Sequence, residues 1–152
     1  YSVASAPRAV GDGYEFYVRL VPILRFTTLL WRLPVGHGMR MIGPKGKFLL
    51  EPDDDRTHLF ISTGTGIAPF ISMTRELLAA GTPRKTVMLH GCSFADELGY
   101  REQLEAWERE GSYPMRYVPT ISRPNDPRNL AATHPMRRES AAATPGLPER
   151  RA

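Results

Sequence analysis

Short apolar runs in the second part of the chain follow the pattern of buried strands. They cover residues 59–61, 86–90 and 115–121. Segments with helical spacing lie between them, so strands and helices alternate along the chain. This order predicts a β-α-β-α-β unit, in which a parallel sheet is joined by right-handed crossovers.

The first predicted helix follows residues 59–61. Pro69 fits its first turn, where a missing N–H group costs nothing. Phe70, Met73 and Leu77 then recur at the spacing of one helical face, and Gly81 can end the helix.

The second predicted helix lies between the second and third strands. Asp96 can cap its N-terminus, and Gly111 can end it. Leu104 and Trp107 are its inward residues, with Tyr100 on the same face.

Residues 1–52 have a different pattern, which predicts β structure with one short helical interruption. A Gly-Asp-Gly turn at 11–13 separates two strand-like runs, and the second run, 14–21, is rich in aromatic and β-branched residues. Residues 26–33 could form a short helix or a loop, and 40–42 return to strand character.

Composition limits the class of protein. A chain of 152 residues with 41% hydrophobic and 24% charged residues is typical of a soluble globular protein with one domain, or with two small or incomplete ones. The longest uncharged stretch, 57–74, contains glycine, proline and hydroxyl residues, so we expect no membrane helix. The single cysteine, Cys92, excludes an internal disulfide framework and a zinc cluster, and favours the cytoplasm.

The net charge of +4 does not indicate nucleic-acid binding. Residues 1–127 hold 15 basic and 14 acidic residues, and the remaining excess of arginine lies from Arg128 onward. A nucleic-acid footprint would instead place lysine and arginine along one face of the folded part. We therefore expect no nucleic-acid partner.

The two ends of the chain have unusual sequences. Residues 1–5 already alternate as in a strand, so we expect the chain to begin inside a domain. Residues 130–152 are rich in alanine, arginine and proline without apolar periodicity, and we expect a disordered or aberrant tail. Such a bias is typical of translation in a shifted frame of GC-rich coding sequence, a hypothesis that the coding DNA tests.

The strongest local motif is Ser-Thr-Gly-Thr-Gly-Ile-Ala-Pro at 62–69, which follows a strand and opens a helix. Glycines at such a junction let the backbone approach a ligand, and the helix N-terminus attracts phosphate. Pro69 occupies the third glycine position of the usual dinucleotide fingerprint, and no acidic residue lies near position 86. The motif predicts nucleotide binding but disfavours a standard NAD dehydrogenase, and a glycine-rich turn without a ligand is the alternative.

Together with this motif, six other short blocks occur in one order along the chain. The seven blocks are YSVAS (1–5), FYVRLV (16–21), FTTL (26–29), GPKGKF (43–48), TGTGIAP (63–69), ADEL (95–98) and ISR (121–123). In this order, they resemble the bacterial ferredoxin (flavodoxin)–NADP reductases over residues 1–129.

The resemblance implies a β plus α/β fold. Residues 1–52 would be the C-terminal part of an antiparallel FAD-binding barrel. Residues 53–129 would be a doubly wound, parallel-sheet NADP-binding domain that lacks its last elements, and 130–152 would be the tail.

The resemblance also implies contacts with FAD. Tyr1 would stack on the flavin ring and Ser2 would hydrogen-bond near the reactive flavin N5, which makes these two the catalytic residues. The other FAD-binding residues would be Tyr17, Val18 and Arg19 at the adenosine half and phosphates, and Phe26, Thr27 and Thr28 at the pyrophosphate. An ordinary strand aromatic at Tyr1 and a helix N-cap pair at Thr27 and Thr28 are the alternatives.

The NADP(H) contacts implied by the resemblance come from two loops. Thr63, Gly64, Thr65 and Gly66 would admit the pyridine nucleotide, with Thr65 between flavin and nicotinamide. Ser122 and Arg123 follow the third strand. A guanidinium and a hydroxyl suit a 2′-phosphate, which favours NADP over NAD. A solvated loop residue is the alternative for Arg123.

Some positions depart from the family pattern. Leu24 and Arg25 stand where a glycine is usual, and Ser93 stands where an arginine often helps to bind the 2′-phosphate. The arginine expected two positions before Tyr1, and the strand, helix and terminal aromatic expected after Asn129, are not in the sequence.

The function implied by the resemblance is electron transfer between NADP(H) and ferredoxin or flavodoxin through FAD. A reductase component of an oxygenase system and a non-catalytic truncated fragment are the alternatives. We expect a monomer without a metal site, because the four histidines lack metal-ligand spacing and each is expected to be structural or exposed.

Overall fold

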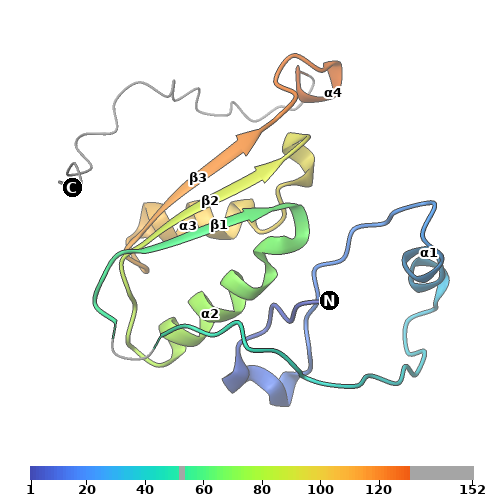
Figure 1. Ribbon diagram of the computed structural model, residues 1–152, viewed down its shortest axis with the longest axis horizontal. Coiled ribbons are helices and arrows are strands. Elements are labelled where there is room, and N and C mark those ends of the chain that lie inside the picture. The colour runs from blue at the N-terminus through green and yellow to red at the C-terminus, as the bar shows by residue number, and fades with distance from the viewer. Residues whose placement is uncertain (52–53, 131–152) are drawn as a thin grey trace, which may run out of the picture.

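A three-stranded parallel sheet forms the centre of the molecule in the computed structural model, which describes residues 1–51 and 54–130 (Figure 1). Strands β1 (His58–Thr63), β2 (Thr86–Cys92) and β3 (Met115–Ile121) lie in the order β1-β2-β3. These are the three predicted strands, and the third has the predicted bounds.

Two helices connect the strands. The 3-10 turn η2 (Gly64–Ile67) leads directly into α2 (Ala68–Ala79), and α3 (Arg101–Glu110) precedes β3. Gly81 and Gly111 follow the ends of these helices with φ of +69° and +64°, a conformation that glycine adopts without strain. Both predicted helix ends are therefore confirmed.

The predicted N-cap at Asp96 is wrong. Asp96 lies in the short 3-10 turn η3 (Ala95–Glu97), and α3 begins only at Arg101. Tyr100 precedes the helix in the left-handed region, with φ of +62°. The Asp96 carboxylate pairs with Arg128 at 2.9 Å, so a partner distant in sequence replaces the local cap.

One face of the sheet carries the core. Phe60, Met88 and Tyr117 are neighbours in the strand register, and all three are buried. Phe70 and Leu77 of α2 and Leu104 of α3 join the same cluster. Both crossovers run between adjacent strands in the same direction, and right-handed connections of this kind place both helices on one face.

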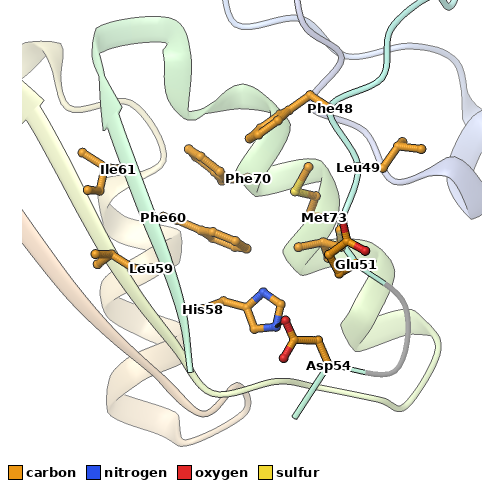
Figure 2. A pocket seen from close by; sticks show the side chains of 11 residues that line it. Phe48, Leu49, Glu51, Asp54, His58, Leu59, Phe60, Ile61, Phe70 and Met73 are labelled. Carbon is orange, nitrogen blue, oxygen red and sulfur yellow. Dashed lines mark ion pairs between the residues drawn. The ribbon is translucent and has the colours of Figure 1, made fainter. Parts of the chain in front are cut away.

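The opposite face of the sheet carries no buried side chain of the described residues. Leu59 and Ile61 point away from Phe60 on β1 and are 58% and 63% exposed (Figure 2). Val87, Leu89 and Val118 share this open face with them and lie outside the core. The described residues thus form one helical layer, not the two layers of a doubly wound sheet.

The N-terminal segment, residues 1–51, contains little regular structure. Its elements are η1 (Pro7–Asp12), α1 (Arg25–Arg32) and a single antiparallel bridge between Val3 and Phe16. The short helix expected near 26–33 is confirmed, but the described residues form no strand at 14–21 or 40–42. Strands need partners for their backbone N–H and C=O groups, and beyond the Val3–Phe16 bridge this segment offers none.

The beginning of this segment packs on α2 (Figure 1). Ala4 is fully buried in the core cluster. The Ser72 hydroxyl donates to the Ser5 carbonyl at 2.7 Å, and the Arg75 guanidinium donates to the Ala4 carbonyl at 3.2 Å. Helix α1, in contrast, stands away from the sheet in Figure 1.

A last short helix, α4 (Pro127–Leu130), follows β3. The predicted tail lies outside the described residues, except for Leu130. Among the described residues, no helix is long and apolar enough to cross a membrane.

Candidate functional site

The loops that follow the three strands meet at one end of the sheet. The three strands run in the same direction (Figure 1), and their register aligns Thr63 with Gly91 and Gly91 with Thr120 near the carboxyl ends. The loops that begin at Gly64 and Ser122 therefore flank the loop after β2. In open parallel sheets, ligands bind just outside the carboxyl ends of the strands.

The two glycines of the turn after β1 differ in backbone conformation. Gly64 has φ of +50°, a conformation that disfavours side chains. Gly66 is not in the left-handed region, and a Cβ atom there would meet nothing within 4 Å. Neither strain nor crowding within the described chain requires a glycine at 66, which leaves room for a ligand to approach the backbone.

The buried side chain of His90 on β2 forms a hydrogen bond with the backbone of this turn. Its Nε2 lies 3.0 Å from the Gly64 carbonyl oxygen, and its Nδ1 lies 3.2 Å from the Tyr117 hydroxyl. A carbonyl only accepts, so Nε2 carries the proton of the neutral ring and Tyr117 donates to Nδ1. Burial lowers the pKa of His90 and outweighs the hydrogen bond to Gly64, which keeps the ring neutral.

Cys92 lies next to this histidine. Its thiol donates to the Glu97 carbonyl oxygen at 3.3 Å, and its Sγ is 3.7 Å from His90 Nε2. Burial is the largest cause that raises the pKa of the Cys92 thiol. The group therefore stays protonated and packs as a small side chain.

Two arginine side chains lie over the ring of Phe94, beside the end of β3. The Arg123 guanidinium carbon lies 5.4 Å from the centre of this ring, and that of Arg128 lies 4.1 Å away. Arg128 also pairs with Asp96 at 2.9 Å and with Glu97 at 3.5 Å. Arg123 forms no ion pair within the described part of the chain, so its charge is available to an anionic ligand.

The predicted flavin-stacking residue Tyr1 is 72% exposed and contacts a second predicted residue. Its ring centre lies 5.3 Å from that of Phe26 on α1, at a tilt of 38°. Ser2 is exposed beside it. The structure thus brings Tyr1, Ser2 and Phe26 together.

Thr27 and Thr28 lie inside α1, which begins at Arg25, so the N-cap alternative for these residues is wrong. The Thr27 hydroxyl is directed at the Val21 carbonyl, 3.0 Å away, and the Thr28 hydroxyl at the Leu24 carbonyl, 2.9 Å away. Both hydroxyl groups therefore already donate their protons to backbone carbonyls of the same chain. A ligand at this helix start would meet backbone N–H groups instead.

Tyr17 and Arg19 connect the N-terminal segment to the loop between β2 and α3. The Tyr17 hydroxyl donates to the Glu97 carbonyl at 2.9 Å and accepts the Gly99 N–H at 3.2 Å. The Arg19 guanidinium pairs with the Glu97 carboxylate at 2.8 Å. Val18, between them, is half-buried.

A separate hollow lies along the free side of β1 and contains none of the predicted site residues (Figure 2). Phe60 and Phe70 stack at 4.4 Å between ring centres on its wall, and Phe48 meets Phe70 edge-on at 5.6 Å. Asp54 faces His58 at 4.0 Å on its floor. Most of the residues that line this hollow are apolar, and it lies away from the strand-end loops.

Sequence reasoning did not identify two side chains that hydrogen-bond the backbone of these loops, those of His90 and Asn129. It treated His90 only as a structural or exposed residue and did not connect it with Gly64. It did not consider Asn129, whose side chain contacts both neighbouring loops. The only signal for Asn129 was its place shortly after the Ile-Ser-Arg block. No group of three metal-ligating side chains gathers in the part of the chain that the structure describes.

Comparisons with known proteins agree with this geometry. The sequence profile of the oxidoreductase NAD-binding domain matches residues 60–141. The chain is 39% identical over 126 residues to ferredoxin–NADP reductase B of Sorangium cellulosum (strain So ce56), which covers 81% of this chain and 50% of that protein. It is 36% identical over 107 residues to methane monooxygenase component C of Methylosinus trichosporium, which covers 69% of this chain and 31% of that protein. The chain therefore spans half or less of the length of these relatives.

Solved structures show the same fold. The ferredoxin–NADP+ reductase of Plasmodium falciparum superimposes with a TM-score of 0.58 at 19% identity, over 79% of this chain and 44% of that one. A mutant of the Plasmodium falciparum enzyme in complex with 2′P-AMP gives a TM-score of 0.57 at 22% identity, over 63% of this chain and 43% of that one.

Proposed function

Because this chain belongs to the ferredoxin–NADP reductase family of flavin-linked NAD(P)-dependent reductases, we propose that its strand-end loops bind NADP(H) in an electron-transfer flavoenzyme. The observation that carries this proposal is the turn at Gly64 and Gly66. It stands at the carboxyl end of β1, Gly66 faces open space, and the buried neutral His90 fixes Gly64 from below.

The nucleotide contacts follow from the ends of the strands. Thr63, Gly64, Thr65 and Gly66 receive the nicotinamide half, because their backbone lies open at the start of the η2–α2 helix. Ser122 and Arg123 receive the 2′-phosphate, because the guanidinium of Arg123, which forms no ion pair with the described residues, lies at the neighbouring loop. This arrangement favours NADP(H) over NAD(H).

The residues for FAD come from the N-terminal segment. Tyr1 offers an exposed ring, with Ser2 beside it. The first turn of α1 holds no acidic residue and no side-chain cap, so the N–H groups of Phe26 and Thr27 suit a pyrophosphate, whereas the Thr28 N–H already donates to the Leu24 carbonyl at 3.2 Å. Tyr17, Val18 and Arg19 complete the set on the adenosine side. Bound FAD supplies the redox chemistry, which is hydride exchange with nicotinamide and one-electron exchange with a carrier protein.

The partner is ferredoxin or flavodoxin under this proposal. The match to a Sorangium cellulosum ferredoxin–NADP reductase supports it. A reductase component of an oxygenase system is the second candidate, favoured by the similarity to methane monooxygenase component C. Reduction of purified ferredoxin, flavodoxin or an oxygenase by a full-length version of this protein separates the two.

Gly66→Val tests nucleotide binding on the 152-residue chain. A side chain at 66 enters open space in the folded chain but blocks a nucleotide that lies against the backbone. We expect at least a tenfold loss of NADP+ affinity, measured by calorimetry, with the unfolding curve unchanged.

Gly38→Val is the matched control. Gly38 also faces open space without a left-handed φ, but it lies far along the chain from the strand ends. If both variants bind NADP+ as the unaltered chain does, or if the unaltered chain binds none, the turn is not a nucleotide site.

A further inference from the structure

The side chain of Asn129 ties together the loops that follow β2 and β3. Its Oδ1 accepts the Ala95 N–H at 2.7 Å. Its Nδ2 donates to the Ser93 carbonyl at 3.1 Å and to the Arg123 carbonyl at 2.6 Å. All three partners are main-chain atoms, and a carboxamide supplies both donors and the acceptor at once.

These bonds surround the one aromatic ring that both nearby cations share. Ser93 and Ala95 flank Phe94, so Asn129 holds the backbone on each side of that ring. The same side chain holds the carbonyl of Arg123, whose guanidinium lies over Phe94. A single residue therefore fixes both the cation and the surface on which it lies.

Asn129 is itself held in place. Its N–H donates to the Asp126 carbonyl at 2.9 Å in the first turn of α4. Its neighbour Arg128 lies over Phe94 and pairs with Asp96. The hydrogen bond to Asp126 and the contacts of Arg128 therefore hold the carboxamide of Asn129 beside the two loops.

We propose that Asn129 is a positioning residue that sets the preference for a 2′-phosphate by fixing Arg123 before the ligand arrives. The inference rests on the proposed function, in which Arg123 meets that phosphate. A guanidinium that is already oriented loses less freedom on binding. Arg128 has a different role, because its charge is paired with Asp96 and Glu97 and it braces Phe94.

The test compares NADP+ with NAD+ on the full 152-residue chain by titration calorimetry. Asn129→Ala lowers NADP+ affinity about tenfold, which is about 1.4 kcal/mol, and changes NAD+ affinity less than twofold. Arg123→Ala gives the reference loss for removal of the cation itself. Asn125→Ala is the matched control, because Asn125 is exposed in the same turn region and its side chain makes no hydrogen bond within the described residues. It leaves both affinities unchanged.

Two further measurements separate positioning from general damage to the fold. Amide exchange at Ala95 becomes faster in Asn129→Ala, while exchange at Met88 in the core does not change. Phe94→Leu removes the ring but keeps the main-chain partners of Asn129, and it also lowers the preference for NADP+.

The outcomes distinguish the two proposals. If the unaltered chain binds NADP+ and NAD+ equally, the proposed nucleotide preference fails and the role of Asn129 fails with it. If the unaltered chain prefers NADP+ and Asn129→Ala keeps that preference, or loses both nucleotides equally, only the role of Asn129 is overturned.

Discussion

The two parts of this chain differ in order, although the less ordered part, residues 1–51, is the richer in apolar residues. In residues 57–130, apolar runs became three paired strands over a buried core. In residues 1–51, runs such as 14–21 formed a single bridge, and large side chains including Ile23, Val35 and Leu49 are 78% exposed or more. The difference shows that an alternating pattern becomes a strand only where a partner strand is available.

The strongest test of this contrast is a matched pair of leucine truncations. Leu104 in α3 is fully buried, whereas Leu29 in α1 is 57% exposed. Leu104→Ala should lower the free energy of unfolding by about 2–5 kcal/mol, because it leaves a cavity. Leu29→Ala should change it by less than about 0.5 kcal/mol. Urea titrations measure both, and equal losses would show that the two parts are equally well packed.

A second test concerns His90, which joins the core to the candidate site. His90→Leu leaves the Gly64 carbonyl and the Tyr117 hydroxyl without this partner, at a cost of about 1–3 kcal/mol. His37→Leu, at an exposed loop position, is the control and should have little effect.

The same histidine predicts a pH dependence. Burial lowers the pKa of His90 in the folded chain, so the unfolded chain binds the proton more tightly. The stability that His90 contributes is therefore present above its unfolded pKa of about 6.5 and is lost as the pH falls toward its folded pKa. Unfolding curves at pH 7 and pH 5 measure this loss, and His90→Leu should reduce it. An unchanged difference between the two pH values would mean that other groups cause it.

The smallest expected effect is at the contact between the two parts. A Cβ atom at Gly99 would lie within 2.8 Å of three atoms of the Tyr17 side chain, two in the ring and the hydroxyl oxygen. Gly99→Ala should displace that ring and lower the free energy of unfolding by about 1 kcal/mol. It should also speed proteolysis within residues 1–51. Gly38→Ala, where nothing lies within 4 Å, should not. Equal cleavage rates in both variants would show that Tyr17 does not hold the segment.

The sequence predicted the α/β half well for physical reasons. Short apolar runs bounded by turn residues leave few alternatives, so β3 was placed at its observed bounds and Gly111 at the end of α3. The start of α3 was missed because Asp96 finds Arg128, 32 residues away, and Tyr100 takes a left-handed conformation that nothing in the sequence indicates.

The candidate site was predicted only in part. The turn at Gly64 and the position of Ser122 and Arg123 follow from strand order, which local pattern can show. The bonds from His90 to Gly64 and from Asn129 to Ser93 cross 26 and 36 residues. Such pairs depend on strand register and loop shape, which appear only after the chain has folded.

The open face of the sheet has a practical consequence. Alternate residues of β1 point to opposite sides, so Leu59 and Ile61 can be changed without contact with Phe60 and the core behind it. In concentrated samples of the unaltered chain, the exposed apolar faces of two molecules should associate, and the solution should become turbid. Lysine at position 59 and threonine at position 61 would give a better-behaved sample for spectroscopy, with the nucleotide end of the sheet left as it is.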